Sequence, residues 1–103
     1  MPNKKEHYNA GLDLFGQKKY AEANAEYQKA LELDPQDSEI HLALSISNML
    51  MGDLDAALVS GKKAAECNPN DPLVFTNLSR ILQKKGMYGE AEDAMALSRQ
   101  LSM

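Results

Sequence analysis

A period of 34 residues runs through the chain and restricts its fold more than any other feature of the sequence. Pro35 returns as Pro69, and the same shift aligns three further sets: His7, His41 and Phe75; Tyr20, Leu54 and Tyr88; Ala23, Ala57 and Ala91. A unit this short cannot bury its own apolar face, so neighbouring units must stack to cover one another. The sequence therefore predicts one domain, residues 1–103, built from three units at residues 4–37, 38–71 and 72–103.

Each unit has the pattern of two helices joined by a tight turn. Asp37 and Asp71 are suited to cap a following helix, and Gly52 and Gly86 suit a turn that needs positive φ. Alanine at position 23 allows two helices to approach closely, and Tyr27 falls on the same helical face. We predict first helices at 4–16, 38–50 and 72–84, and second helices at 20–33, 54–67 and 88–101.

The first unit carries Gly11, then Tyr20-Ala21-Glu22-Ala23, then a run from Tyr27 to Pro35. These residues resemble the consensus of the tetratricopeptide repeat family, and the resemblance extends over residues 4–103. It implies an all-α solenoid of three helical hairpins wound into a right-handed superhelix. It also implies a scaffold for protein–protein interaction, although the family serves many unrelated systems.

In this family the first helix of each repeat lines a concave surface. The resemblance therefore implies a partner-binding site that contains Tyr8, Leu12, Phe15, Leu42, Ile46, Met49, Asn77, Arg80 and Lys84. The predicted helix at 38–50 is apolar nearly all round, so its side chains are either buried or cover a partner. For Leu44 we prefer burial, and for Leu42, Ile46 and Met49 we expect a ligand-facing role.

Charge differs between the repeats. The first two units are net acidic, whereas residues 72–103 carry a net charge of +1. Arg80 and Lys84 are four residues apart and share a helical face with Asn77. We expect the two basic residues to anchor a carboxylate and Asn77 to hydrogen-bond a peptide backbone. The alternative is that these residues only keep an exposed helix solvated.

The chaperone adaptors of the family hold a carboxylate pair with Lys, Asn, Asn, Lys and Arg. The matching positions here are Tyr8, Leu12, Ala43, Leu73 and Asn77, so that ligand is not expected. The apolar groove is more similar to the three-repeat chaperones of bacterial secretion substrates. We therefore expect an adaptor that binds a partner peptide or amphipathic segment, in a chaperone-like manner. Alternatives are a module that self-assembles through Leu97 and Leu101, and a fragment of a larger array.

Catalysis and cofactor binding find little support in the sequence. His7 and His41 occupy one repeat position that Phe75 fills in the third unit, so we interpret them as packing residues. Cys67 has no neighbouring cation to stabilise a thiolate. We expect no enzyme activity, no cofactor and no metal. With a net charge of −4 and no long apolar run, we also expect no nucleic-acid or membrane partner, and a cytoplasmic location.

Overall fold

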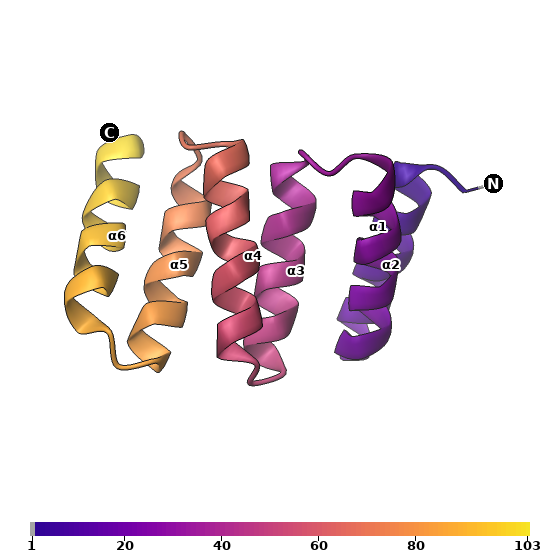
Figure 1. The fold of residues 1–103 in the computed structure, drawn as a ribbon, viewed down its shortest axis with the longest axis horizontal. Helices are drawn as coiled ribbons and strands as arrows, with labels where there is room; N and C mark the ends of the chain where they lie inside the picture. The colour runs from indigo at the N-terminus through magenta and orange to yellow at the C-terminus, as the bar shows by residue number, and fades with distance from the viewer. Residues whose placement is uncertain (1) are drawn as a thin grey trace.

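The computed structural model describes residues 2–103, and all regular secondary structure in that range is α-helical. Six helices follow one another along the chain (Figure 1): α1 (Lys4–Gly16), α2 (Tyr20–Leu33), α3 (Ser38–Leu50), α4 (Leu54–Cys67), α5 (Pro72–Lys84) and α6 (Tyr88–Leu101). The predicted all-α class and all six predicted helix ranges are confirmed. The division into repeat units at residues 4–37, 38–71 and 72–103 stays a prediction.

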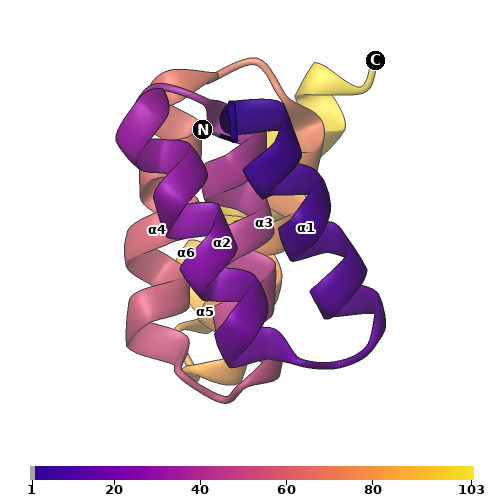
Figure 2. The same cartoon turned by 90° about the vertical axis from the view of Figure 1, so that its right-hand side faces the viewer.

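The helices form three antiparallel hairpins that stack in chain order (Figure 1). Within each hairpin the two helices pack on each other, and the hairpins are joined where α2 packs on α3 and α4 packs on α5. The result is an elongated body of 43 × 26 × 19 Å. Seen from its end, α1 lies on one side and α2 and α4 lie on the other (Figure 2).

Short acidic and amide side chains begin most of the helices. Asp37 accepts a hydrogen bond from the backbone nitrogen of Ile40, at 3.2 Å, and Asp71 accepts one from Leu73, at 2.9 Å. Asp53 caps α4 in the same way. These contacts satisfy backbone donors that a helix leaves free in its first turn, and they confirm the predicted helix starts.

The turn inside each hairpin places one residue in the left-handed region. Gly52 has φ of 84° and Gly86 has φ of 80°, as the sequence predicts. The first hairpin has Lys18 at the equivalent position, with φ of 63°. A side chain with a Cβ atom is strained there, whereas glycine is not.

Replacing Lys18 by glycine should therefore stabilise the protein. We expect the free energy of unfolding to rise by about 0.5–1 kcal/mol, because the relief of backbone strain exceeds the added flexibility of the unfolded chain. Urea denaturation followed by circular dichroism measures the change. Gln17→Gly is the matched control, because Gln17 lies in the same turn with φ of −87° and so has no strain to relieve; it should destabilise.

The core is formed by small and large side chains that pack together between the helices. Ala23, Tyr27 and Ala30 are fully buried in one cluster, and Leu44 from the next hairpin joins them, as expected from the sequence. In the second and third hairpins a serine takes the place of Gly11. Their hydroxyls donate to backbone carbonyls of the paired helix: Ser45 to Ala57, at 2.7 Å, and Ser79 to Ala91, at 2.8 Å.

Candidate partner-binding groove

A hollow opens between α1 and α3 on the surface that the first helices line. Its volume is about 240 Å³. Side chains from α1, α2 and α3 form its wall: Tyr8, Leu12, Phe15, Tyr27, Glu39, Leu42, Ala43 and Ile46. We call it the α1–α3 hollow. Glu39 is the one acidic member of this wall, and all the other members are apolar or aromatic.

Two positions at the α1–α3 interface have smaller side chains than the equivalent positions at the α3–α5 interface. Between α3 and α5, the Asn77 side-chain nitrogen donates to the Ser45 hydroxyl at 2.9 Å, and both residues are buried. One repeat earlier, the positions of Asn77 and Ser45 are held by Ala43 and Gly11. Neither residue can form that hydrogen bond. The ring of Tyr27 occupies the space beside Gly11, whereas the space beside Ala43 stays open.

Gly11 has a second role, because it makes room for the Tyr27 ring. A Cβ atom built on Gly11 would lie 2.5 Å from Cε1 of Tyr27. The ring of Tyr27 is 0% exposed and lies 6.0 Å, centroid to centroid, from the ring of Tyr8. Glycine on α1 therefore allows a large aromatic side chain on α2 to form the base of the hollow.

The two tyrosines on the wall of the hollow carry no charge. Burial raises the pKa of Tyr27 to about 12, with a further contribution from Tyr8. Burial is also the main cause that raises the pKa of Tyr8, followed by the charges of Glu39 and Asp37. Both phenols are therefore neutral at neutral pH. The Tyr27 hydroxyl is buried and has no hydrogen-bond partner among the described residues.

The size of the hollow suits a single large side chain. An empty apolar cavity of roughly 150 Å³ in a protein core accepts benzene, so about 240 Å³ accommodates one aromatic or branched aliphatic group. A more polar hollow of about 340 Å³ lies beside it and shares Tyr8 and Glu39. The opening therefore continues along α1 and α3 towards their N-terminal ends.

The structure brings together five of the predicted site residues and separates the others. Tyr8, Leu12, Phe15, Leu42 and Ile46 all line the α1–α3 hollow. Leu12 is the most accessible of these side chains to solvent, at 40% exposed, and the other four are half-buried. Their proximity makes the hollow the centre of the candidate site.

Met49 lies further along α3, is half-buried, and does not contribute to the wall of the hollow. Asn77 differs from the sequence-based expectation. Its side chain is only 5% exposed, and its amide nitrogen is committed to Ser45. The expectation that Asn77 hydrogen-bonds a peptide in the groove is corrected to a structural role between α3 and α5.

Arg80 and Lys84 are exposed on α5. Arg80 occupies on α5 the repeat position that Ile46 occupies on α3, and Lys84 follows one turn later. The ion pairs of the described residues engage Lys4, Lys29, Lys63 and Lys85 but neither Arg80 nor Lys84. Both cations therefore stand on the same surface as the hollow without an acidic partner.

Two wall residues, Glu39 and Ala43, fall on concave repeat positions but were not singled out as site residues, and a third, Tyr27, was not placed on that surface. Tyr27 was interpreted only as a core residue, because its repeat position faces the paired helix. A register comparison could have identified Ala43: the sequence pairs Ser45 with Asn77 at one interface but Gly11 with Ala43 at the other. That loss of side-chain volume can be seen in the sequence alone.

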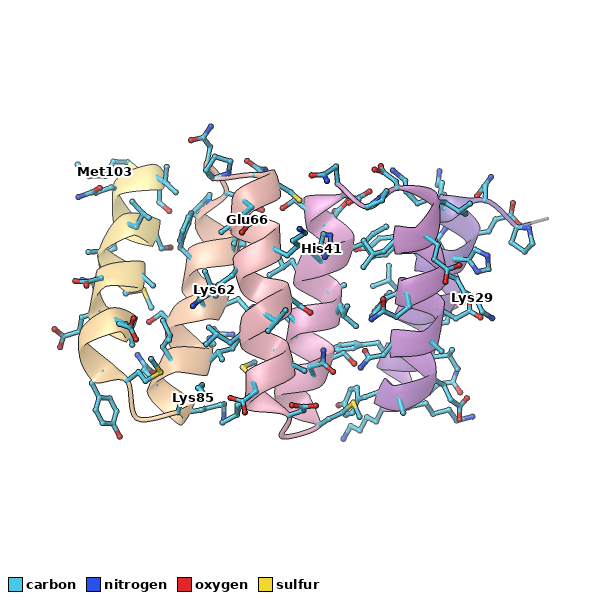
Figure 3. The ribbon with its side chains drawn as sticks, viewed as in Figure 1. Lys29, His41, Lys62, Glu66, Lys85 and Met103 are labelled. Carbon is cyan, nitrogen blue, oxygen red and sulfur yellow. The ribbon has the colours of Figure 1, made fainter. Side chains whose placement is uncertain are left out.

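The histidines and the cysteine have structural surroundings. His7 Nδ1 donates to Glu26 Oε2 at 2.8 Å, and this hydrogen bond is the main cause that lowers the pKa of Glu26. His41, near the start of α3 (Figure 3), donates from Nε2 to the Pro35 carbonyl at 2.8 Å. Cys67 lies 3.5 Å from the Gln36 side-chain oxygen. These contacts agree with packing roles for both histidines.

Among residues 2–103, no group of three His, Cys, Asp or Glu side chains is placed to hold a metal ion. In the same range, no helix combines the length and the apolar character that crossing a membrane requires.

The last helix ends in a small apolar edge. Leu97 is 39% exposed and Leu101 is half-buried, while Met103 lies at the end of the chain and is fully exposed (Figure 3). The predicted self-association through Leu97 and Leu101 stays a prediction.

Comparison with known proteins agrees with this architecture. Two family models described as tetratricopeptide repeat match residues 14–75 and 61–93. The photosystem I assembly protein Ycf3 of Synechococcus sp. (strain WH7803) is 34% identical over 89 residues, or 84% of this chain and 51% of that protein. This chain thus spans about half the length of its Ycf3 relatives.

Solved structures share the fold over nearly the whole chain. The type III secretion chaperone SycD of Yersinia enterocolitica, in complex with a peptide of the translocator YopD, has a TM-score of 0.91 and 27% identity, covering 94% of this chain and 74% of SycD. The first tetratricopeptide domain of Spaghetti (RPAP3), bound to an HSP90 peptide, has a TM-score of 0.93 at 17% identity, covering 96% of this chain and 79% of that one. The latter likeness concerns the fold alone. With a family model matched over more than half of its length, this chain belongs to the tetratricopeptide repeat family.

Proposed function

We propose that the protein is a chaperone-like adaptor that binds an extended segment of a partner protein on its concave surface. The observation that carries the proposal is the α1–α3 hollow, an open apolar site made by side chains of the first two hairpins. The segment would insert one large apolar side chain between α1 and α3. Its remaining residues would lie along the first helices.

The surroundings of the hollow support a peptide rather than a small metabolite. Seven of its eight wall residues are apolar or aromatic, and Glu39 is the one charged group among them. Few polar groups converge there to orient a small polar molecule. Beyond the hollow, Leu50 at the end of α3 and Leu73 near the start of α5 are also exposed, at 50% and 66%. A chain of several residues can contact such side chains in addition to the hollow.

The relatives point in the same direction. The SycD structure, at 27% identity, holds a peptide of a secreted translocator. Ycf3 is named as an assembly protein for photosystem I. Both names describe proteins that act on other proteins, which supports an adaptor role for this chain.

The expected affinity is modest. Burying one large apolar side chain contributes about 1.5–3 kcal/mol, whereas association costs roughly 4–15 kcal/mol before any net binding appears. Several further contacts along the groove are therefore needed. We expect dissociation constants of about micromolar or weaker.

Selection from a phage-displayed library of random dodecapeptides tests the proposal. Peptides retained by the wild type should be enriched in Leu, Ile, Phe or Met at one position. Two variants should fail to bind these peptides, for different reasons. Ala43→Leu fills the hollow without adding charge, and Ile46→Glu places a carboxylate on its wall. We expect each to weaken binding of a synthetic selected peptide at least tenfold in fluorescence polarisation.

The matched control is Val59→Glu, because Val59 is 70% exposed on α4 and does not line the hollow. It should bind the peptide as the wild type does. Circular dichroism and thermal unfolding confirm that each variant is folded. Unchanged affinity in folded Ala43→Leu and Ile46→Glu would remove the hollow as the binding site.

From the sequence we also predict that the protein has no enzyme activity and is located in the cytoplasm. The adaptor role needs neither a catalytic group nor a cofactor. A different outcome, self-assembly through the exposed edge of α6, predicts a dimer in sedimentation that Leu97→Glu abolishes.

A further inference from the structure

The concave surface changes character along the solenoid. Around the α1–α3 hollow it is apolar, and on α5 it becomes basic. Arg80 replaces the leucine and isoleucine that the first two repeats carry at the same position, Leu12 and Ile46. A segment that extends from the hollow towards α5 would therefore leave an apolar site and reach two cations.

The charge on α5 is unusual for this chain. The protein carries a net charge of −4, yet α5 is the one helix of the six within residues 2–103 with more basic than acidic residues. It contains Arg80 and Lys84 and no acidic residue. Lys84 in the last turn stabilises the helix dipole. Arg80 lies in the middle of the helix, where the dipole gives no such reason.

The next basic residue along the chain, Lys85, differs in being paired, because it contacts Asp55 on α4. Arg80 and Lys84 take part in none of the ion pairs within the described part of the chain. Two unpaired like charges one helical turn apart repel each other, so an external carboxylate would lower the energy of both.

We propose that the partner segment carries an acidic residue beside its apolar anchor, and that Arg80 and Lys84 bind this carboxylate while the α1–α3 hollow holds the anchor. The inference rests on the proposed function and names the chemistry of its ligand. Charge complementarity favours binding of the acidic residue at α5, which carries two cations and no acidic side chain. The one charged group on the wall of the hollow, Glu39, repels a carboxylate there.

The geometry sets the spacing between the two ligand groups. Arg80 and Ile46 occupy the same position on α5 and α3, which are in contact. Packed helices lie about 8–10 Å apart, and an extended chain advances about 3.3–3.6 Å per residue. The hollow lies between α1 and α3, half a helix spacing beyond α3, so the anchor and the two cations are roughly 12–15 Å apart. The acidic residue therefore lies about three or four residues from the apolar anchor.

The same dodecapeptide library separates this inference from the general function. In peptides selected by the wild type, Asp or Glu should be enriched about three or four residues from the apolar anchor, on one side of it. The double variant Arg80→Glu/Lys84→Glu should instead enrich Lys or Arg at that spacing. The control Lys62→Glu/Lys63→Glu makes the same charge change on α4 (Figure 3), outside the hollow, and should select acidic residues as before.

Synthetic peptides measure how much the acidic residue contributes to binding affinity. A peptide with Glu at the selected position should bind the wild type about fivefold to tenfold more tightly than its Gln counterpart at low salt, with the difference shrinking as salt is added. In folded Arg80→Gln/Lys84→Gln the two peptides should bind equally.

Each result bears on one of the two proposals. Apolar enrichment without an acidic preference, or an acidic preference that survives charge reversal on α5, overturns the inference and leaves the proposed function standing. The absence of any apolar enrichment overturns both. A switch from acidic to basic residues in the double variant alone supports the inference.

Discussion

Replacing Tyr27 by alanine is expected to destabilise the protein by about 3–5 kcal/mol. The ring is fully buried at the junction of the first two hairpins, where it packs with Ala23, Ala30 and Leu44 and forms part of the wall of the hollow. Truncation removes both the apolar burial and the contacts that close the junction. A domain of ordinary stability has about 5–15 kcal/mol in total, so we expect a large fall in the midpoint of urea denaturation.

Tyr27→Phe is the matched control, because it keeps the ring and removes only the hydroxyl. That hydroxyl is buried and has no partner among the described residues. Removing an unsatisfied polar group is neutral or stabilising, by up to about 1 kcal/mol. If Tyr27→Ala cost no more than Tyr27→Phe, the ring would not hold the two hairpins together.

Replacing Gly11 by alanine is expected to cost about 1–3 kcal/mol. The new methyl group would lie 2.5 and 2.7 Å from two ring carbons of Tyr27, and 3.2 Å from the backbone oxygen of Ala23. Neither neighbour can move freely, because one is a core side chain and the other is helix backbone. The overlap outweighs the gain of up to about 1 kcal/mol that alanine brings to a helix interior.

Two comparisons identify the cause. Gly89→Ala makes the same change at a helical glycine with no atom within 4 Å of the new Cβ, so it should be neutral or stabilising. Gly11→Ala should also cost less in a Tyr27→Leu background, since leucine lacks the ring that the methyl group meets. Equal effects of Gly11→Ala in both backgrounds would show that the Tyr27 ring is not the obstacle.

The sequence predicted the helices fully, for a physical reason. A 34-residue period repeats each cap and turn, so the signals at Asp37 and Asp71, or at Gly52 and Gly86, reinforce one another. The one irregular turn is at Lys18, where a residue that gives no turn signal still adopts positive φ. Backbone hydrogen bonds from Lys18 to Phe15 and from Lys19 to Leu14 close the turn and hold that conformation against the local preference.

The candidate site was predicted less completely, because repeat positions define a surface but not its depth. Leu12, Leu42 and Ile46 were placed on the concave surface, and the structure adds that they surround one hollow. Asn77 holds an equivalent position to Ala43, yet its side chain turns inward to Ser45. Whether a polar side chain faces solvent depends on whether the adjacent helix provides a hydrogen-bond partner. That partner belongs to a different repeat, as Ser45 does for Asn77.

The missing bridge between α1 and α3 also affects how the three hairpins act together. The second and third hairpins share the buried Asn77–Ser45 hydrogen bond in addition to the packing of α4 on α5. Between the first and second hairpins, no side chain from Ala43 or Gly11 supplies an equivalent bond. In a linear array, stability is roughly the sum of each unit and its contacts with neighbours. A segment seated between α1 and α3 would contact both hairpins where these two helices form no such bond, so its binding should make the first two hairpins unfold more cooperatively.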